Sequence, residues 1–138
     1  MDNTIVWADI AVTDLDRAMR FYGAVLQTKF APAEGMDGIA LEVPPEDFDP
    51  SSMEPPFPVS FDLALMPDHK PSMDGTTIYL NGLGDAEGML ERAVAAGGEI
   101  LAPVEYMGEM VGSLGFFKDS EGNRIGVHKP PEMPPPQE

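Results

Sequence analysis

The sequence contains no cysteine, few basic residues and no long apolar run. Without cysteine the chain forms no disulfide, no thiolate nucleophile and no cysteine-ligated metal site. This composition fits a cytosolic protein, so we expect a cytoplasmic location. No apolar segment reaches the ~18 residues that a transmembrane helix needs, and the start Met1-Asp2-Asn3 lacks the basic residues of a secretory signal. We therefore expect no membrane association.

The charge is strongly one-sided: 8 lysine and arginine residues stand against 24 aspartate and glutamate residues, a net charge of −16. Nucleic acid and anionic membranes are poor partners for such a chain, because both bind concentrated basic surfaces. An acidic surface attracts cationic small molecules instead. The alternative interpretation is that the charge serves solubility alone.

The 138 residues fit a single domain, and a hydrophobic content of 43% is enough for a core. Within this domain a pattern recurs. Asp14 and Asp85 each stand between an apolar segment and a helical pattern, and Pro32 recurs as Pro103 at the same offset. A constant order at constant spacing indicates two similar modules. A module of about 60 residues must bury its apolar face against its twin or against a partner chain.

The first module begins with a predicted strand at Ile5–Val12, which is apolar enough on both faces to be buried on both. Thr13 and Asp16 are placed to form a capping box at the start of a helix. That helix carries an apolar stripe at helical spacing, and three strands are expected after it. The stripe consists of Leu15, Ala18, Met19, Tyr22, Val25 and Leu26, and the strands are Thr28–Ala31, Ile39–Val43 and Val59–Met66.

The second module repeats this order. A strand at Thr76–Asn81, also expected to be buried on both faces, precedes a helix that Gly97-Gly98 should end. A strand at Glu99–Ala102 follows, and a hairpin is expected around the turn-forming run Asp119-Ser120-Glu121-Gly122. The hairpin strands are Gly112–Lys118 and Asn123–His128, and the residues from 130 to 138 are expected to form a proline-rich, disordered tail.

Three segments carry a family likeness: VTDLDRAMRFYGAVL, AAGGEILAP and FFKDSEGNRIGVH. Together they resemble the glyoxalase/bleomycin-resistance/extradiol-dioxygenase superfamily, also called vicinal oxygen chelate proteins, over residues 5–129. The resemblance implies a single α+β domain within residues 1–129. It would hold two βαβββ modules, at about 4–67 and 75–129, joined by a linker at 68–74. Their sheets would curl into a half-open barrel around a ligand cavity, usually in a homodimer. It implies no single activity, because the superfamily includes lyases, dioxygenases, epimerases and drug-binding proteins.

The metal-dependent members of that superfamily carry His or Glu at four cavity-facing positions, one on the first and one on the fourth strand of each module. The resemblance places Trp7, Asp62, Thr76 or Thr77, and Gly126 at these positions. Only Asp62 is a normal metal ligand, whereas a catalytic divalent metal generally needs about three protein ligands. We therefore expect neither a metal nor another cofactor there, which argues against activities that use the metal as a Lewis acid or redox centre.

Strand alternation predicts which side chains face the cavity. The candidates are Trp7, Asp9, Ser60, Asp62, Thr77, Tyr79, Arg124 and His128, together with Phe116 or Phe117, whichever turns inward. Trp7 and Tyr79 either stack on a planar or cationic ligand or fill the barrel interior.

The charged candidates each have two interpretations. Asp9 and Asp62 either pair with Arg124, the interpretation that we favour, or await a cationic ligand, because unpaired buried carboxylates are costly. His128 is either a general base or replacement ligand, or, as we favour, the half-exposed end of its strand at the cavity rim. His69 is expected to be a solvated loop residue.

Two functions of different classes follow. The first is a metal-free protein that encloses a planar or cationic small molecule in a homodimer cleft, with the proline-rich segment Pro44–Pro58 as a lid. The second is a superfamily enzyme that is either metal-free, with Tyr79, His128 or a carboxylate transferring protons, or dependent on a rearranged metal site of Asp9, Asp62 and His128. The sequence does not specify the ligand.

Overall fold

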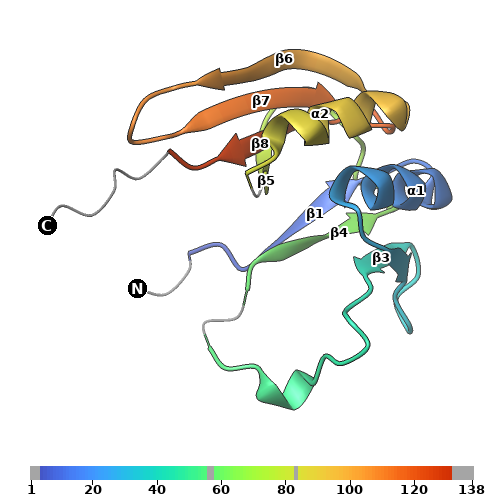
Figure 1. Ribbon diagram of the computed structural model, residues 1–138. Coiled ribbons are helices and arrows are strands. Elements are labelled where there is room, and N and C mark those ends of the chain that lie inside the picture. Colours follow the sequence, from blue (N-terminus) through green and yellow to red (C-terminus); the bar gives the residue numbers. More distant parts are fainter. Residues whose placement is uncertain (1–3, 56–57, 83, 132–138) are drawn as a thin grey trace, which may run out of the picture.

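The computed structural model describes residues 4–55, 58–82 and 84–131. These residues form two βαβββ modules, as predicted, in an α+β fold (Figure 1). The first module consists of β1 (Trp7–Ala11), α1 (Leu15–Leu26), β2 (Phe30–Pro32), β3 (Ile39–Glu42), the short 3-10 helix η1 (Pro50–Ser52) and β4 (Ser60–Ala64). The second consists of β5 (Ile78–Asn81), α2 (Ala86–Ala95), β6 (Glu99–Tyr106), β7 (Ser113–Lys118) and β8 (Arg124–Lys129). Most of the expected tail, residues 132–138, lies outside the described residues, as do residues 1–3 and residues 56 and 57 of the expected lid.

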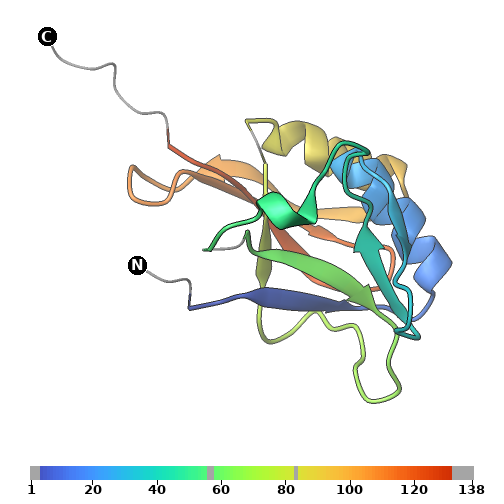
Figure 2. The same cartoon turned by 90° about the horizontal axis from the view of Figure 1, so that it is seen from below.

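The two sheets have the same topology. Their strand orders are β1-β4-β3-β2 and β5-β8-β7-β6, so the first and last strands of each module are neighbours and run parallel. The other pairs are antiparallel. Figure 2 shows β1 and β4 lying side by side along the first module. The duplication predicted from the sequence is therefore a duplication of topology.

The offset between the modules differs by one position between the helices and the strands that precede them. Asp14 caps α1 and Asp85 caps α2, which sets the offset of the helices. The strands before them end at Ala11 and Asn81, and the connection that follows Asn81 is longer by one residue than its counterpart after Ala11. Corresponding strand residues of the two modules are therefore separated by one position fewer than the helix caps, and this shift makes Thr77, not Thr76, the counterpart of Trp7.

Helix α1 is capped by Asp14, and the predicted capping box of Thr13 and Asp16 is wrong. Asp14 Oδ1 accepts a hydrogen bond from the backbone N–H of Arg17 over 3.0 Å. The backbone N–H of Thr13 donates to Glu121 Oε1 over 2.9 Å, so Thr13 serves a contact between the modules. Neither α1 nor α2, the α-helices of the described segments, has the length and apolar character that a membrane crossing demands.

One hydrophobic core serves both modules. The helices lie side by side in Figure 1, and Arg92 Nε of α2 donates to the backbone oxygen of Val25 in α1 over 2.9 Å. Phe21 of α1 packs against Phe117 of β7, with 5.8 Å between ring centroids. Each module thus buries its apolar face against its twin. The core comprises Ile10, Val12, Ala18, Phe21, Tyr22, Val25, Ala40, Leu63, Leu80, Ala86, Met89, Leu90, Ala93, Phe117, Ile125 and Val127.

Strands β1 and β5 are buried on one face only, contrary to the prediction that both faces would be buried. Trp7 is 44% exposed and Tyr79 is 47% exposed, while their neighbours Ile10 and Leu80 are in the core. The second face of each strand borders an open cavity instead of a packed layer. Apolar side chains on both faces of a strand do not distinguish a packed layer from an aromatic cavity wall.

Strand β6 is longer than the predicted Glu99–Ala102, since it continues to Tyr106. Pro103 lies within this extension, although proline cannot donate to a β-ladder. Here β6 is the edge of its sheet and its pairing with β7 shifts register around Ala102, so the missing N–H disrupts little. The predicted hairpin of β7 and β8 is confirmed, with Phe116 opposite Gly126.

Candidate ligand-binding cavity

A cavity of about 970 Å³ lies where β1, β5 and the linker between the modules meet. Its volume is in the range of about 300–1,000 Å³ that small-molecule sites occupy. The predicted site residues that line it are Trp7, Asp9, Ser60, Thr77, Tyr79 and Arg124. These side chains come from β1, β4, β8, β5 and the segment leading into β5, so both modules contribute to the cavity.

Four other predicted site residues do not line this cavity. Asp62 and Phe116 stand directly behind it, against Trp7 and Arg124 respectively. Phe117 is wholly buried in the core, which shows that Phe116 is the member of the pair on the cavity side of the sheet.

His128 is the fourth. Its Nε2 lies 2.6 Å from the backbone oxygen of Val111, in the connection between β6 and β7. The partly exposed ring stands at the end of its strand, as the structural interpretation expected, but away from the cavity.

Asp62 and Trp7 form the best-defined polar contact at the cavity. The indole N–H of Trp7 donates to Asp62 Oδ2 over 3.0 Å. Asp62 is only 6% exposed, and among the described residues its Oδ1 has no hydrogen-bond partner. Asp9 is directly opposite Asp62 in the parallel ladder of β1 and β4. Two acidic side chains therefore share one face of the sheet at adjacent positions.

The surroundings of Asp62 favour its protonated form. Burial raises the pKa of Asp62 most, the hydrogen bond from Trp7 lowers it, and the interaction with Asp9 raises it, to about 6. The charge of His69 lowers this pKa slightly. A carboxyl group with this pKa takes up and releases a proton close to neutral pH, and it does so as one member of a pair.

The side chain of Arg124 contacts residues of its own module. Its Nη1 donates to Thr77 Oγ1 over 2.8 Å, and its guanidinium carbon lies 4.0 Å from the centroid of the Phe116 ring. Phe116 in turn meets Tyr79 edge-on, with 5.7 Å between centroids. The guanidinium is therefore fixed between a hydroxyl and an aromatic face.

The favoured pairing of Arg124 with Asp9 or Asp62 is wrong. The ion pairs among the described residues are Arg17 with Glu121 and Arg92 with Asp85, and neither involves Arg124. The reason is topological: Arg124 begins β8 in the second sheet, beside Thr77, whereas both aspartates belong to the first sheet.

The side chains at the superfamily's metal positions do not fit a metal. With the shorter offset of the strands, Trp7 corresponds to Thr77, whose hydroxyl already accepts from Arg124. A Cβ at Gly126 would collide with the ring of Tyr79, which occupies that space. Aromatic rings and a guanidinium thus stand where metal ligands would be needed.

The rearranged metal site of Asp9, Asp62 and His128 is not assembled either. His128 contacts the backbone of Val111 in the connection between β6 and β7, whereas Asp9 and Asp62 lie opposite each other in the ladder of β1 and β4. Across residues 4–55, 58–82 and 84–131, no three histidine or acidic side chains are grouped so as to hold a metal ion.

The linker supplies cavity residues that the sequence did not reveal. His69, expected to be solvated, is half-buried, and together with Lys70 it lines the cavity. A linker without periodicity carries no signal for this position. Residues 44–55 and 58 of the expected lid do not line the cavity. Glu42 and Val59, which lie just outside that segment, do.

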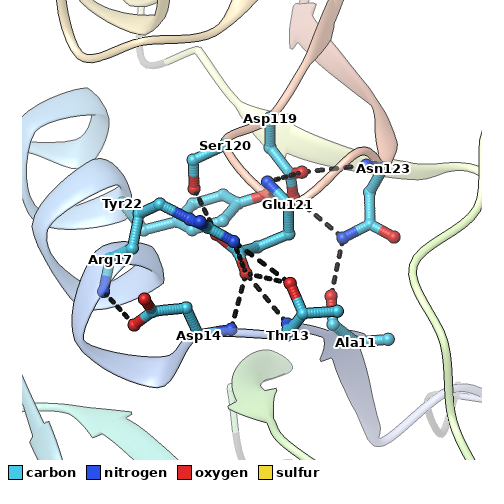
Figure 3. A network of polar contacts seen from close by, with 9 residues as sticks. All are labelled: Ala11, Thr13, Asp14, Arg17, Tyr22, Asp119, Ser120, Glu121 and Asn123. Carbon is cyan, nitrogen blue, oxygen red and sulfur yellow. Dashed lines mark hydrogen bonds and ion pairs between the residues drawn. The ribbon is translucent and has the colours of Figure 1, made fainter.

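A polar clamp, defined here as Glu121, Asp119 and Asn123 of the turn between β7 and β8, ties the second module to the first (Figure 3). Glu121 accepts from the backbone N–H groups of Thr13 and Asp14, both over 2.9 Å, and its Oε2 accepts from Arg17 Nε over 2.7 Å. Burial by itself raises the pKa of Glu121, but these donors together outweigh burial and lower the pKa to about 2.

The rest of the clamp is buried. The hydroxyl of Tyr22 donates to Asp119 Oδ2 over 2.6 Å, and Asn123 Nδ2 donates to the backbone oxygen of Ala11 over 2.7 Å. Asn123 also accepts from the backbone N–H of Ser72 in the linker over 3.0 Å. Because Ala11 ends β1 and Ser72 lines the cavity, the clamp fixes the relative position of two cavity walls.

Comparison with known proteins places this fold. The family model described as "Glyoxalase/Bleomycin resistance protein/Dioxygenase superfamily" matches residues 4–127. No functionally curated protein sequence matches the chain.

Solved structures share the fold. A glyoxalase/bleomycin resistance protein from Albidiferax ferrireducens T118 has a TM-score of 0.65 and 16% identity, over 93% of this chain and 100% of that one. A glyoxalase-related enzyme from Fulvimarina pelagi has a TM-score of 0.60 and 18% identity, over 91% and 87%. A superfamily member from Sphaerobacter thermophilus DSM 20745 has a TM-score of 0.58 and 21% identity, over 91% and 96%. At these identities the likeness shows the fold alone. The match of the family model over nearly all described residues shows the family: the chain belongs to the glyoxalase/bleomycin resistance protein/dioxygenase superfamily.

Proposed function

We propose that this protein binds a small, planar organic molecule in the cavity between β1 and β5, without the metal of its superfamily. The single observation that carries this proposal is the cavity of about 970 Å³ with Trp7 and Tyr79 on its walls. These rings are 44% and 47% exposed, and the other rings of comparable exposure among the described residues, Phe48 and Tyr106, lie away from the cavity. Exposed aromatic faces around a cavity are suited to stacking on a flat ligand.

The acidic pair supports a ligand with a cationic group. Asp9 lines the cavity, and Asp62 behind Trp7 retains an oxygen without a partner among the described residues. A cation placed beside Asp9 would relieve the repulsion between the two carboxylates. The net charge of −16 would raise the local concentration of such a ligand.

A second candidate function is metal-free acid–base catalysis. The observation that favours it is the pKa of about 6 for Asp62, beside Asp9 at the cavity wall. A group that titrates near neutral pH suits proton transfer. A reaction whose rate follows the titration of Asp62 and is lost in Asp62→Asn would select this function over binding alone.

We further propose that the protein acts as a homodimer in the cytoplasm, with the partner completing a half-open barrel. Ile5 and Val6, which lead into β1, are 65% and 74% exposed. Apolar residues next to an open cavity suit coverage by a second copy. The lack of cysteine fits the reducing cytoplasm.

The emission of Trp7, the only tryptophan, tests the binding function. Benzamidine, which is planar and cationic, should quench or shift this emission, and its neutral isostere benzamide should do so more weakly. Calorimetry should show that Asp9→Asn, which changes the carboxylate on the cavity wall, weakens benzamidine binding by roughly 1–3 kcal/mol, because a charge-assisted hydrogen bond is lost. The control Asp47→Asn removes an equal charge from an exposed loop and should leave binding unchanged. Equal binding of benzamide and benzamidine by both variants would exclude an acidic subsite.

A further inference from the structure

We propose that Arg124 forms an oxyanion-binding subsite of the cavity, so that the ligand carries a carboxylate or phosphate group in addition to its planar and cationic parts. This inference rests on the proposed binding function and narrows its ligand class. It starts from the position of Arg124 on the cavity wall, where the residue is partly buried and its guanidinium is bound to Thr77.

Arg124 lacks a counter-charge from the described part of the chain. The chain has 24 acidic residues and 8 basic ones, so acidic partners are plentiful. Among the described residues, Arg17 and Arg92 have such partners in Glu121 and Asp85, whereas Arg124 has no carboxylate within ion-pair distance. A partly buried guanidinium without a carboxylate indicates that its counter-charge comes from outside the chain.

The guanidinium of Arg124 is pre-organised by its neighbours. Thr77 Oγ1 accepts from Nη1 over 2.8 Å, and the Phe116 ring covers one face of the guanidinium at 4.0 Å. These contacts fix the plane of the side chain and use one of its five N–H donors. The remaining donors keep the planar fork that binds carboxylate and phosphate in a bidentate manner. Lys70, also on the cavity wall, adds a second positive charge.

The acidic and basic side chains at the cavity belong to different sheets. Asp9 and Asp62 lie on β1 and β4 of the first sheet, and Arg124 lies on β8 of the second, with the cavity bordered by both sheets. Across the described structure these side chains form no ion pair with one another. A ligand with a cationic end and an anionic end would pair with both, whereas a simple cation would leave Arg124 unpaired. The expected ligand is therefore an ampholyte whose two charged groups are carried by different parts of one flat molecule.

A matched series of probes tests this inference by calorimetry on the full chain: benzamide, benzamidine, benzoate and para-amidinobenzoate. These share one planar ring and differ in charge. We expect para-amidinobenzoate to bind at least about tenfold more tightly than benzamidine, as one charge-assisted hydrogen bond is worth about that factor. Phenyl phosphate in place of benzoate then distinguishes the two sources of the oxyanion, and binding by either one supports the subsite.

Variants locate the effect. Arg124→Gln should remove the advantage of para-amidinobenzoate over benzamidine, so the ratio of the two affinities is the quantity to measure. Thr77→Val keeps the charge but releases the guanidinium, so it should lose part of that advantage. Arg20→Gln is the control, because Arg20 is an exposed arginine of α1 that does not line the cavity. Circular dichroism confirms that each variant is folded.

The outcomes separate the two proposals. If benzamidine binds and its carboxylate derivative gains nothing, the oxyanion subsite is wrong and the binding function stands. If Arg124→Gln weakens benzamidine and para-amidinobenzoate equally while the fold is retained, Arg124 has only a structural role and the inference is likewise wrong. If no probe binds at millimolar concentrations, both proposals fail.

Discussion

The indole N–H of Trp7 donates to Oδ2 of Asp62 over 3.0 Å, joining two parallel strands that are far apart in the chain. The contact leaves Oδ1 of Asp62 without a partner among the described residues, directly opposite Asp9. Trp7 is therefore both a wall of the cavity and a reporter for the charge of Asp62. Burial destabilises the carboxylate more than the indole donor stabilises it.

Asp62→Asn should stabilise the protein at neutral pH. The pKa of Asp62 rises from 3.8 to about 6 on folding. Between these values the folded state binds more protons than the unfolded state, so stability falls as pH rises through this window. The loss above about pH 6 is on the order of 2–3 kcal/mol.

Urea denaturation at pH 4.5 and pH 7.5 measures this effect. The difference between Asp62→Asn and the wild type should grow in favour of the variant at the higher pH. Asp47→Asn, an exposed-loop control, should show no such change. A variant that is less stable than the wild type at both pH values would contradict the unfavourable charge at Asp62.

Glu121→Gln should destabilise the protein, with the opposite pH dependence. The pKa of Glu121 is lowered from 4.5 to about 2, so the unfolded state binds more protons within that window. Its contribution is complete above about pH 4.5 and is lost as pH falls towards 2, on the order of 2–3 kcal/mol. Glu109→Gln, in the exposed connection before β7, serves as a control. Acid titration of the melting temperature should show a shallower fall in Glu121→Gln than in the wild type, and parallel curves would rule out this role.

Tyr22→Phe should lower the free energy of unfolding by about 1–3 kcal/mol, because a buried carboxylate oxygen of Asp119 loses its hydroxyl donor. The hydroxyl of Tyr22 donates to this oxygen over 2.6 Å, and the residue is wholly buried. Tyr106→Phe removes a hydroxyl from a side chain that is 59% exposed and should change stability by no more than about 0.5 kcal/mol. Chemical denaturation of both variants checks the contrast. Equal effects would mean that the clamp contributes little.

We expect the purified protein to carry no stoichiometric Zn²⁺, Ni²⁺ or Fe²⁺ at the superfamily position. Trp7, Thr77 and Gly126 offer no ligating side chain there, and Tyr79 fills the space above Gly126. Mass spectrometry of protein prepared without added metal, and melting temperature before and after a chelator, measure this directly. Stoichiometric metal that disappears in Asp62→Ala would show that our assignment of these positions is wrong.

The proposed homodimer predicts a mass in solution of about twice the 14.9 kDa of one chain. Burial of the exposed Ile5 and Val6 provides the physical reason. Light scattering at micromolar concentration measures the mass. Val6→Asp should shift the protein towards the monomer, because it places a charge in the apolar contact, whereas Val94→Asp on the exposed face of α2 should not. A mass near that of one chain for the wild type would exclude the dimer.

Local patterns in the sequence were sufficient for the order of the α-helices and strands, but not for the 3-10 helix η1 within the segment expected to be a loop. Helix α2 ends at Ala95, just before the predicted stop at Gly97-Gly98. Gly97 has a φ of +105°, which is accessible to glycine, and Gly98 N–H closes the turn on Ala93 O over 2.7 Å. The alternation along β8 correctly separated Arg124 and Gly126 from the core residue Ile125. Such signals depend on neighbours within a few positions, so they survive without knowledge of the fold.

The partners of the site residues were decided by tertiary structure. Whether Arg124 pairs with Asp62 or with Thr77 depends on which sheet each strand joins, and one additional residue before α2 changes which residues of the two modules correspond. His69 reaches the cavity because the linker returns to the wall that β1 forms, and no local pattern encodes that path. The sequence by itself determined the modules, while the charges of the cavity depend on contacts between residues that are distant in the chain, because burial and pairing are properties of the assembled sheets.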